Sequence, residues 1–130
     1  MKQITIISED SLGVVTEICE ALAAAGVNIE SLDAETIGGS GVTKLTVDRY
    51  DDALRALAQT PFHAISEEAI VLQLEDKPGE LARITRRLKD ANISIRSVRI
   101  VRRATGTSIV AISTERAEEA MELLKDVMIS

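Results

Sequence analysis

The chain has 130 residues, of which 45% are apolar and 28% charged, and its formal net charge is −6. This length fits one domain or two very small ones, with enough chain to bury a hydrophobic core. Tyr50 and Phe62 are the only aromatic residues, so stacking surfaces for nucleotide bases are not expected. The acidic charge also argues against nucleic-acid binding, whose affinity comes largely from neutralising phosphates.

Cysteine and histidine occur once each, as Cys19 and His63. An internal disulfide and a CxxC motif are therefore excluded. With a single histidine, a histidine metal site or a Ser–His or Cys–His catalytic pair is not favoured. We expect Cys19 to be a small core residue and His63 to be a surface or hydrogen-bonded one. With no signal peptide and no apolar run near the roughly 20 residues of a membrane span, we predict a cytoplasmic protein without membrane association, metal or cofactor.

The sequence repeats itself at an offset of 66 positions. Residues 4–13 align with residues 70–79, and toward the end of each copy the offset becomes 67. A long period that occurs only twice indicates a duplicated small domain, because a solenoid needs three or more repeats. We therefore predict two units, residues 1–66 and residues 67–130, joined by too short a link for independent motion.

Each copy begins with the same predicted elements. An apolar, β-branched run at residues 3–8 or residues 70–74 indicates a strand that ends at an acidic, glycine-containing turn. Apolar residues then recur at helical spacing and place one apolar stripe on a helix that covers a sheet. The stripe consists of Val15, Ile18, Leu22 and Ala25 in the first copy and of Leu81, Ile84, Leu88 and Ala91 in the second. Gly26 and Asn92, which tolerate a left-handed backbone, end the two helices.

The predicted second strand carries the same irregularity in both copies. Ile29 and Leu32 are three residues apart, as are Ile95 and Val98, whereas only an even gap keeps two side chains on one face of a strand. An extra residue in the strand allows both side chains of such a pair to point to the same face of the sheet. We predict β-bulges near Glu30–Ser31 and Arg96–Ser97.

The remainder of each copy predicts a hairpin, a third strand, a second helix and a fourth strand. Glycines mark the hairpin in both copies, and the fourth strand falls at residues 62–66 in the first copy and at residues 127–129 in the second. The order β-α-β-β-α-β is that of the ferredoxin-like sandwich. We predict an α+β fold of two tandem ferredoxin-like units, with antiparallel sheets and helices on one face.

Two short motifs accompany these elements. The first turn of the second copy reads Asp76-Lys-Pro-Gly-Glu-Leu81, and Ala91-Asn-Ile-Ser-Ile95 precedes its second strand; the first copy has Asp10-Ser-Leu-Gly13 and Ala25-Gly-Val-Asn-Ile29 in the same places. In this order of elements, the motifs resemble those of ACT domains, the small ligand-sensing modules of amino-acid metabolism. The resemblance covers essentially the whole chain and is to free-standing members with two such domains and no catalytic domain.

The resemblance implies a site for a small metabolite, typically an amino acid, at the interface between paired ACT units. A helix N-terminus suits the ligand's carboxylate, and an aspartate suits its ammonium group. Asp10 and Asp76 match a polar position that contacts ligand in several family members, and Asn28 matches a second one. The candidate ligand-binding residues are Asp10, Ser11, Leu12, Gly13, Val14 and Asn28 in the first copy and Asp76, Lys77, Pro78, Gly79, Glu80 and Leu81 in the second.

Two further interpretations of these residues remain open. Each aspartate is also a suitable cap for the helix that follows, with no role in binding. Ser94 stands in the place of Asn28, so we expect the two sites to differ. We also expect Pro78 in the first helical turn, where its missing N–H group costs nothing.

Charge is divided unevenly between the copies. Residues 1–66 contain 4 basic and 10 acidic side chains, whereas residues 67–130 contain 11 of each. The basic side chains of the second copy are expected on a solvated face, or against the acidic first copy of the same chain or of a partner. Because small sheets leave edges that invite pairing, we predict a homodimer in which the basic second copy lies near an acidic first copy.

The function predicted from these observations is that of a non-enzymatic regulatory protein that binds an amino acid. The alternative is a ligand-free dimerisation module, or a regulatory subunit whose partner is an amino-acid biosynthetic enzyme. An enzyme on the same fold is the least favoured class. Neither first turn carries the arginine with asparagine, or the CxxC, that the hydrolases and metal chaperones of this fold need. We assign no catalytic residues.

Overall fold

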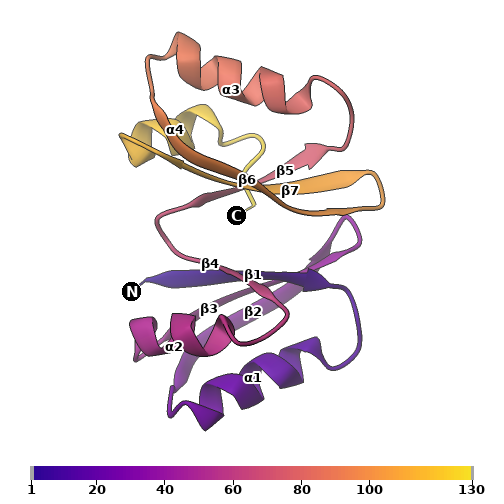
Figure 1. Cartoon of the computed structure of the whole chain (residues 1–130), viewed down its shortest axis with the longest axis vertical. Helices are drawn as coiled ribbons and strands as arrows, with labels where there is room; N and C mark the ends of the chain where they lie inside the picture. Colours follow the sequence, from indigo (N-terminus) through magenta and orange to yellow (C-terminus); the bar gives the residue numbers. More distant parts are fainter. Residues whose placement is uncertain (1, 130) are drawn as a thin grey trace. The chain divides into compact units, whose positions relative to one another are not determined.

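The computed structural model describes residues 2–129, and the chain divides into two units, Met1–Glu67 and Glu68–Ser130. The elements are labelled in Figure 1. Those of the first unit are β1 (Gln3–Glu9), α1 (Val14–Ala24), β2 (Ile29–Ile37), β3 (Ser40–Val47), α2 (Tyr50–Leu57) and β4 (His63–Ile65). Those of the second unit are β5 (Ile70–Glu75), α3 (Glu80–Asp90), β6 (Ile95–Ala104), β7 (Thr107–Thr114) and α4 (Ala117–Leu123).

Each unit contains an antiparallel sheet, which confirms the α+β class. The strand order is β2-β3-β1-β4 in the first sheet and β5-β7-β6 in the second, so β2 and β6 are edge strands. The fourth strand predicted at residues 127–129 is not formed as a strand. It is reduced to one bridge between Leu72 and Met128, because only the hydrogen bonds Gln73 N–H to Val127 O and Ile129 N–H to Val71 O join it to β5.

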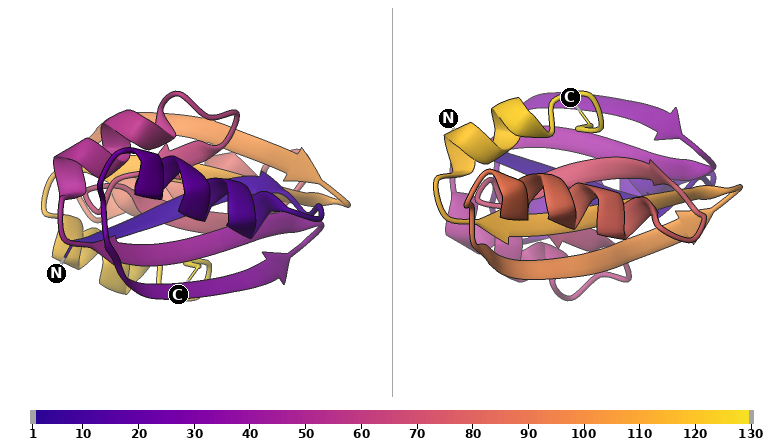
Figure 2. Two further views of the ribbon diagram at one scale, coloured as in Figure 1. Left: turned by 90° about the horizontal axis from the view of Figure 1, so that it is seen from below. Right: turned by 90° about the horizontal axis from the view of Figure 1, so that it is seen from above.

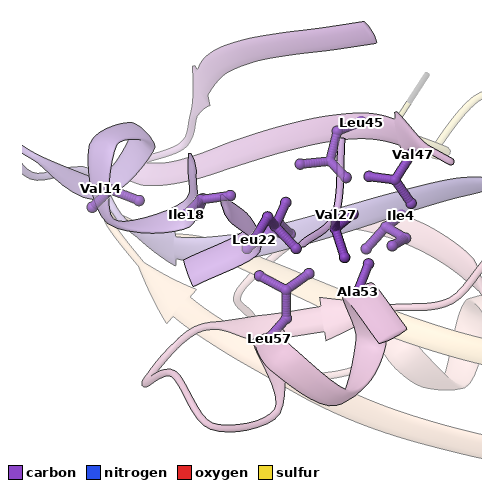
Figure 3. Close-up of a cluster of buried hydrophobic side chains, with 10 residues drawn as sticks. Ile4, Val14, Ile18, Leu22, Val27, Leu45, Val47, Ala53 and Leu57 are labelled. Atoms are coloured by element: carbon purple, nitrogen blue, oxygen red, sulfur yellow. The ribbon is translucent and has the colours of Figure 1, made fainter. Parts of the chain in front are cut away.

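One face of each sheet is covered by the two helices of its unit, α1 and α2 in the first and α3 and α4 in the second (Figure 2). Ile18 and Leu22 of α1 are fully buried against β1 and β3, and Ala53 and Leu57 add α2 to the same core (Figure 3). The second core contains Ile84 and Leu88 of α3, Ala120 of α4, and Leu124, which directly follows α4. The centre of each predicted helical stripe is therefore confirmed.

The ends of the predicted stripes are not buried. Val15 is 40% exposed and Ala25 is exposed, whereas Val14 contributes to the first core instead. In the second unit, Leu81 is half-buried and Ala91 is exposed. Ala25 and Ala91 lie just past the last residues of α1 and α3, where they remain in contact with water.

Both predicted bulges are present. The register of β2 shifts between Ile29 and Ser31, and that of β6 shifts between Ile95 and Ser97. A second shift in β6, between Ile100 and Arg102, was not predicted. This extra residue makes β6 10 residues long where β2 has 9, and it explains why the repeat offset changes from 66 to 67.

Left-handed residues set the ends of the helices. Gly26 and Asn92, with φ of 72° and 63°, follow α1 and α3 as predicted. The prediction that Pro78 lies in the first turn of α3 is wrong. The helix begins at Glu80 because Gly79, at φ 91°, has a left-handed backbone that cannot belong to a right-handed helix. Pro78 therefore lies in the preceding turn.

The single cysteine and the single histidine both lie in the first unit. Cys19 is half-buried on α1, and His63 is exposed on β4. No helix within residues 2–129 is long and apolar enough to cross a membrane.

Candidate functional site

A small cleft lies in the first unit between the β1–α1 turn, the start of α1 and the end of β2. Its volume is about 150 Å³. Asp10 and Ser11 line it from the turn, Val14 and Val15 from α1, and residues 34–36 from β2. Pockets for drug-sized ligands usually measure roughly 300–1,000 Å³, so this cleft has the size for a small metabolite.

Small residues on β1 and β3 leave room for the cleft. Gly41 on β3 stands opposite Ser8 on β1. A Cβ atom on residue 41 would lie only 2.6 Å from Ser8 Oγ and 3.0 Å from the carbonyl oxygen of Glu9. In the second unit the equivalent positions hold Ser108 and Leu74, which have larger side chains and line the corresponding cleft.

Asp10 reaches from the turn toward the end of β2. Its Oδ1 accepts a hydrogen bond of 3.2 Å from Thr36 Oγ1, and it forms no ion pair with any residue that the structure describes. The capping interpretation is wrong for Asp10, because no side chain caps α1 and left-handed Gly13 occupies its N-cap position. A negative carboxylate therefore stands beside the first turn of α1, whose backbone N–H groups have no partners within the helix.

The corresponding cleft of the second unit is smaller, at about 60 Å³. Arg103 Nε lies 3.3 Å from Asp76 Oδ1 and so joins β6 to the β5–α3 turn. Arg103 pairs with Ser108 as Thr36 pairs with Gly41, so arginine replaces threonine at the equivalent position. The side chain that only donates a hydrogen bond in the first unit is thus replaced by one that neutralises the aspartate.

The other charges of the β5–α3 turn are also paired with one another. Lys77 Nζ lies 3.0 Å from Glu75 and 3.8 Å from Glu80, and Arg83 lies 2.7 Å from Glu80. The hydrogen bond to Glu75 raises the pKa of Lys77, and the hydrogen bond from Arg83 lowers the pKa of Glu80. Asp76 does not cap α3, since no side chain does. The second turn therefore presents no unpaired carboxylate to a ligand.

The predicted site residues of the two turns are placed unequally. In the first turn, Leu12 is fully exposed and does not line the cleft, and Gly13 shapes the backbone. In the second, Pro78 and Gly79 also lie outside the cleft. The cleft walls are formed by the remaining predicted residues, which are Asp10, Ser11, Val14, Asp76, Lys77, Glu80 and Leu81.

Asn28 is not brought to the cleft of its own unit. Its backbone N–H donates to Asp48 Oδ1 at 2.9 Å, at the first end of β2. The cleft lies at the other end of this strand, beside Thr36. At about 3.3 Å per strand residue, Asn28 and Thr36 are roughly 25 Å apart.

Sequence reasoning missed the residues that β2, β3 and β6 contribute. Thr36, Gly41 and Arg103 define the difference between the two clefts, yet none belongs to a recognisable motif. Gly41 was assigned to the predicted hairpin, whereas in the structure it lies within β3, where a glycine often marks a close approach of two backbones. Within residues 2–129 there is no group of three or more His, Cys, Asp or Glu side chains arranged to hold a metal ion.

Comparisons with known proteins concern the fold and one family. Residues 69–127 match the ACT domain family, whereas no curated protein matches the chain in sequence. Protein BT0572 from Bacteroides thetaiotaomicron superposes with a TM-score of 0.51 at 23% identity, over 98% of this chain and 90% of that one. The regulatory subunit of aspartate kinase from Thermus thermophilus gives 0.45 at 20% identity, over 96% and 91%. The acetolactate synthase small subunit from Thermotoga maritima gives 0.42 at 14%, over 99% and 89%.

Proposed function

The second unit of this chain belongs to the ACT domain family, and from this premise we propose that the protein is a non-enzymatic regulator that binds an amino acid. The proposed site is the cleft of the first unit. One observation carries the proposal: Asp10 presents a carboxylate without an ion pair directly beside the open N-terminus of α1.

The two ends of the cleft suit the two charges that every amino acid carries. The ammonium group of the ligand binds Asp10 and takes over or shares the place of the Thr36 hydroxyl. The carboxylate faces the backbone N–H groups of the first turn of α1, where the helix dipole also favours a negative group. Val14, Val15 and Ala34 leave an apolar wall for a short side chain.

The second unit has a different role in this proposal. Arg103 already forms an ion pair with Asp76. The ammonium group of a ligand would have to displace the Arg103 guanidinium from this carboxylate. The smaller volume of this cleft also disfavours a ligand. The second unit therefore supports the fold and the assembly of the protein, and the first unit binds the amino acid.

A second candidate function is a ligand-free interaction module whose partner is an enzyme of amino-acid biosynthesis. The exposed apolar side chains beside the cleft favour it, because Leu12 is fully exposed and Val15 is 40% exposed. Side chains of this kind at the mouth of a cleft suit contact with another protein.

Calorimetric titration with each of the common amino acids tests the proposal. We expect one of them to bind the wild type, and Asp10→Asn to weaken binding about tenfold to a hundredfold, because a charge-assisted contact is lost. Asp76→Asn is the matched control and leaves the affinity unchanged. A bound amino acid at 100 times its Kd also adds about 2.7 kcal/mol of stability, which a thermal shift detects. Absence of heat with every amino acid would leave the interaction module as the better reading.

A further inference from the structure

The first cleft contains a buried hydroxyl group without a hydrogen-bond partner in the described chain. Thr43 lies on β3 opposite Ile6 of the core, is only 3% exposed, and lines the cleft. Its hydroxyl forms no hydrogen bond with any residue that the structure describes. Because a buried hydroxyl without a partner costs free energy, its presence in the wall of a cleft favours a hydrogen bond with a ligand.

The second unit indicates that the fold does not need this hydroxyl. Val110 is the residue equivalent to Thr43, since it lies opposite Leu72 as Thr43 lies opposite Ile6. It is 1% exposed and belongs to the core of its unit. Valine has nearly the shape of threonine, with a methyl group in place of the hydroxyl. Packing at this position therefore does not explain the hydroxyl of the first unit.

The charges of the first cleft are all negative. Glu9, Asp10 and Glu35 line it, and none of its described lining residues is a lysine, arginine or histidine. None of the three carboxylates forms an ion pair with any residue from 2 to 129. A neutral amino acid brings one ammonium group and one carboxylate, so it leaves this negative charge uncompensated. A ligand with an additional positive charge complements the cleft better.

The second unit supplies the cations for its cleft from its own chain. Glu75 and Asp76 line this cleft at the positions equivalent to Glu9 and Asp10. Lys77 Nζ lies 3.0 Å from Glu75, and the Arg103 guanidinium lies 3.3 Å from Asp76. Both cationic side chains are among the lining residues as well. Two carboxylates of the repeat are thus paired with two separate cations.

Both of these cations are missing from the first unit. Ser11 stands at the position of the lysine, and Thr36 stands at the position of the arginine. Glu9 and Asp10 keep the two carboxylates. The first cleft therefore has the acidic members of two ion pairs, and the places of their basic partners are left to a ligand.

We propose that the amino acid bound in the first cleft is a diamino acid, whose side chain ends in a second ammonium group. The α-ammonium group binds Asp10, as in the proposed function on which this assignment rests. The side-chain ammonium group binds Glu9. Thr43 donates its hydrogen bond to the ligand's carboxylate, which lies beside the first turn of α1. The methylene groups of the ligand lie against Val14 and its apolar neighbours.

Calorimetric titration with matched pairs of amino acids tests the proposal. Ornithine and norleucine have side chains of equal length, but only ornithine ends in an ammonium group. Diaminobutyrate with norvaline forms a shorter pair of the same kind, and lysine with α-aminoheptanoate a longer one. We expect at least one diamino acid to bind about tenfold or more tightly than its neutral counterpart, because only the diamino acid makes the second charge-assisted contact.

Substitution of Glu9 separates the two contacts. We expect Glu9→Gln to lower the affinity for the diamino acid about tenfold and to leave that of the neutral counterpart unchanged. Glu75→Gln makes the same change of charge in the second unit and leaves both affinities as they are in the wild type.

Substitution of Thr43 tests the buried hydroxyl. We expect Thr43→Val to lower the affinity for both members of a pair about tenfold, because both carry the carboxylate. The thermal midpoint of the ligand-free protein is expected to stay unchanged or rise, since no internal hydrogen bond is lost and valine is accommodated at Val110. Thr5→Val is the control, because Thr5 is a buried threonine of β1 that does not line the cleft.

The results distinguish failure of this assignment from failure of the proposed function. Neutral amino acids that bind as tightly as the diamino acids would overturn the assignment and leave amino-acid binding intact. Absence of heat with every amino acid would overturn both. An equal loss for both members of a pair in Glu9→Gln would contradict a contact between Glu9 and the second ammonium group. An unchanged affinity with a lower thermal midpoint in Thr43→Val would give Thr43 a structural role only.

Discussion

The two units place an aspartate at the same point of the same fold, but different side chains contact it. In the first unit, Asp10 accepts a hydrogen bond from Thr36 and forms no ion pair with any described residue. In the second, Asp76 forms an ion pair with Arg103, and the larger Leu74 stands at the position equivalent to Ser8. The clefts of the two units, of about 150 Å³ and 60 Å³, therefore differ by a few side chains on neighbouring strands.

Core substitutions test whether the hydrophobic cores of the two units contribute equally to stability. Ile18 and Ile84 are equivalent and both fully buried. We expect Ile18→Ala and Ile84→Ala each to lower the free energy of unfolding of its unit by about 2–5 kcal/mol, through lost burial and a remaining cavity. Chemical denaturation followed by amide exchange in each unit measures the two effects. A large effect in one unit and none in the other would break the likeness of the cores.

Exchanging the side chain opposite the aspartate tests what separates the clefts. Thr36→Arg places a guanidinium within reach of Asp10, as Arg103 is of Asp76, and we expect amino-acid affinity to fall about tenfold or more. Arg103→Thr is the matched control in the second unit and leaves that affinity unchanged. Calorimetry measures both variants, and an unchanged affinity in Thr36→Arg would show that the charge of Asp10 is not used.

A substitution on β3, whose residues line the first cleft, is expected to have a smaller effect on affinity. Gly41→Ala brings a methyl group against Ser8 Oγ and the Glu9 carbonyl, so we expect a loss of about 1–3 kcal/mol in stability and weaker binding. Ser108→Ala, at the equivalent position, removes an atom and introduces no such overlap. Thermal denaturation compares the two. Equal losses would mean that the difference in volume does not come from this strand pair.

The smallest expected effect concerns acid. Arg87 holds Asp126 at 2.7 Å, a pair whose equivalent positions in the first unit are Ala21 and Gln59. The hydrogen bond from Arg87 lowers the pKa of Asp126, so its stabilisation is present above the unfolded pKa and is lost as the pH falls through the folded one. We expect lower protection of the Ile129 amide from exchange in acid, after correction for the intrinsic exchange rate at each pH, and the same loss of protection at neutral pH in Asp126→Asn. If neither acid pH nor Asp126→Asn alters the exchange of this amide, the Arg87–Asp126 ion pair does not stabilise the segment around Ile129.

Local pattern was sufficient for most of the fold. Helical spacing identified Ile18, Leu22 and their equivalents as core, and the three-residue gap between Ile29 and Leu32 revealed a bulge before any strand was seen. These features are local, because the period of apolar residues reports the geometry of a single element. The second bulge of β6, between Ile100 and Arg102, was not predicted, although the change of the repeat offset from 66 to 67 recorded the inserted residue.

The sequence by itself determined the repeat, the order of elements, the buried helix stripes, and the aspartate in each first turn. Only the tertiary structure decided which groups face those aspartates, because Thr36 and Arg103 lie more than 25 positions away along the chain and reach them through strand register. Asn28 directly precedes β2, whereas Asp10 contacts Thr36 near the last residue of this strand, so nearly the whole strand separates the two. A motif consists of residues that are neighbours in sequence, whereas a cleft is lined by residues that are neighbours across a sheet. One inserted residue in a strand therefore changes which side chain lines the cleft.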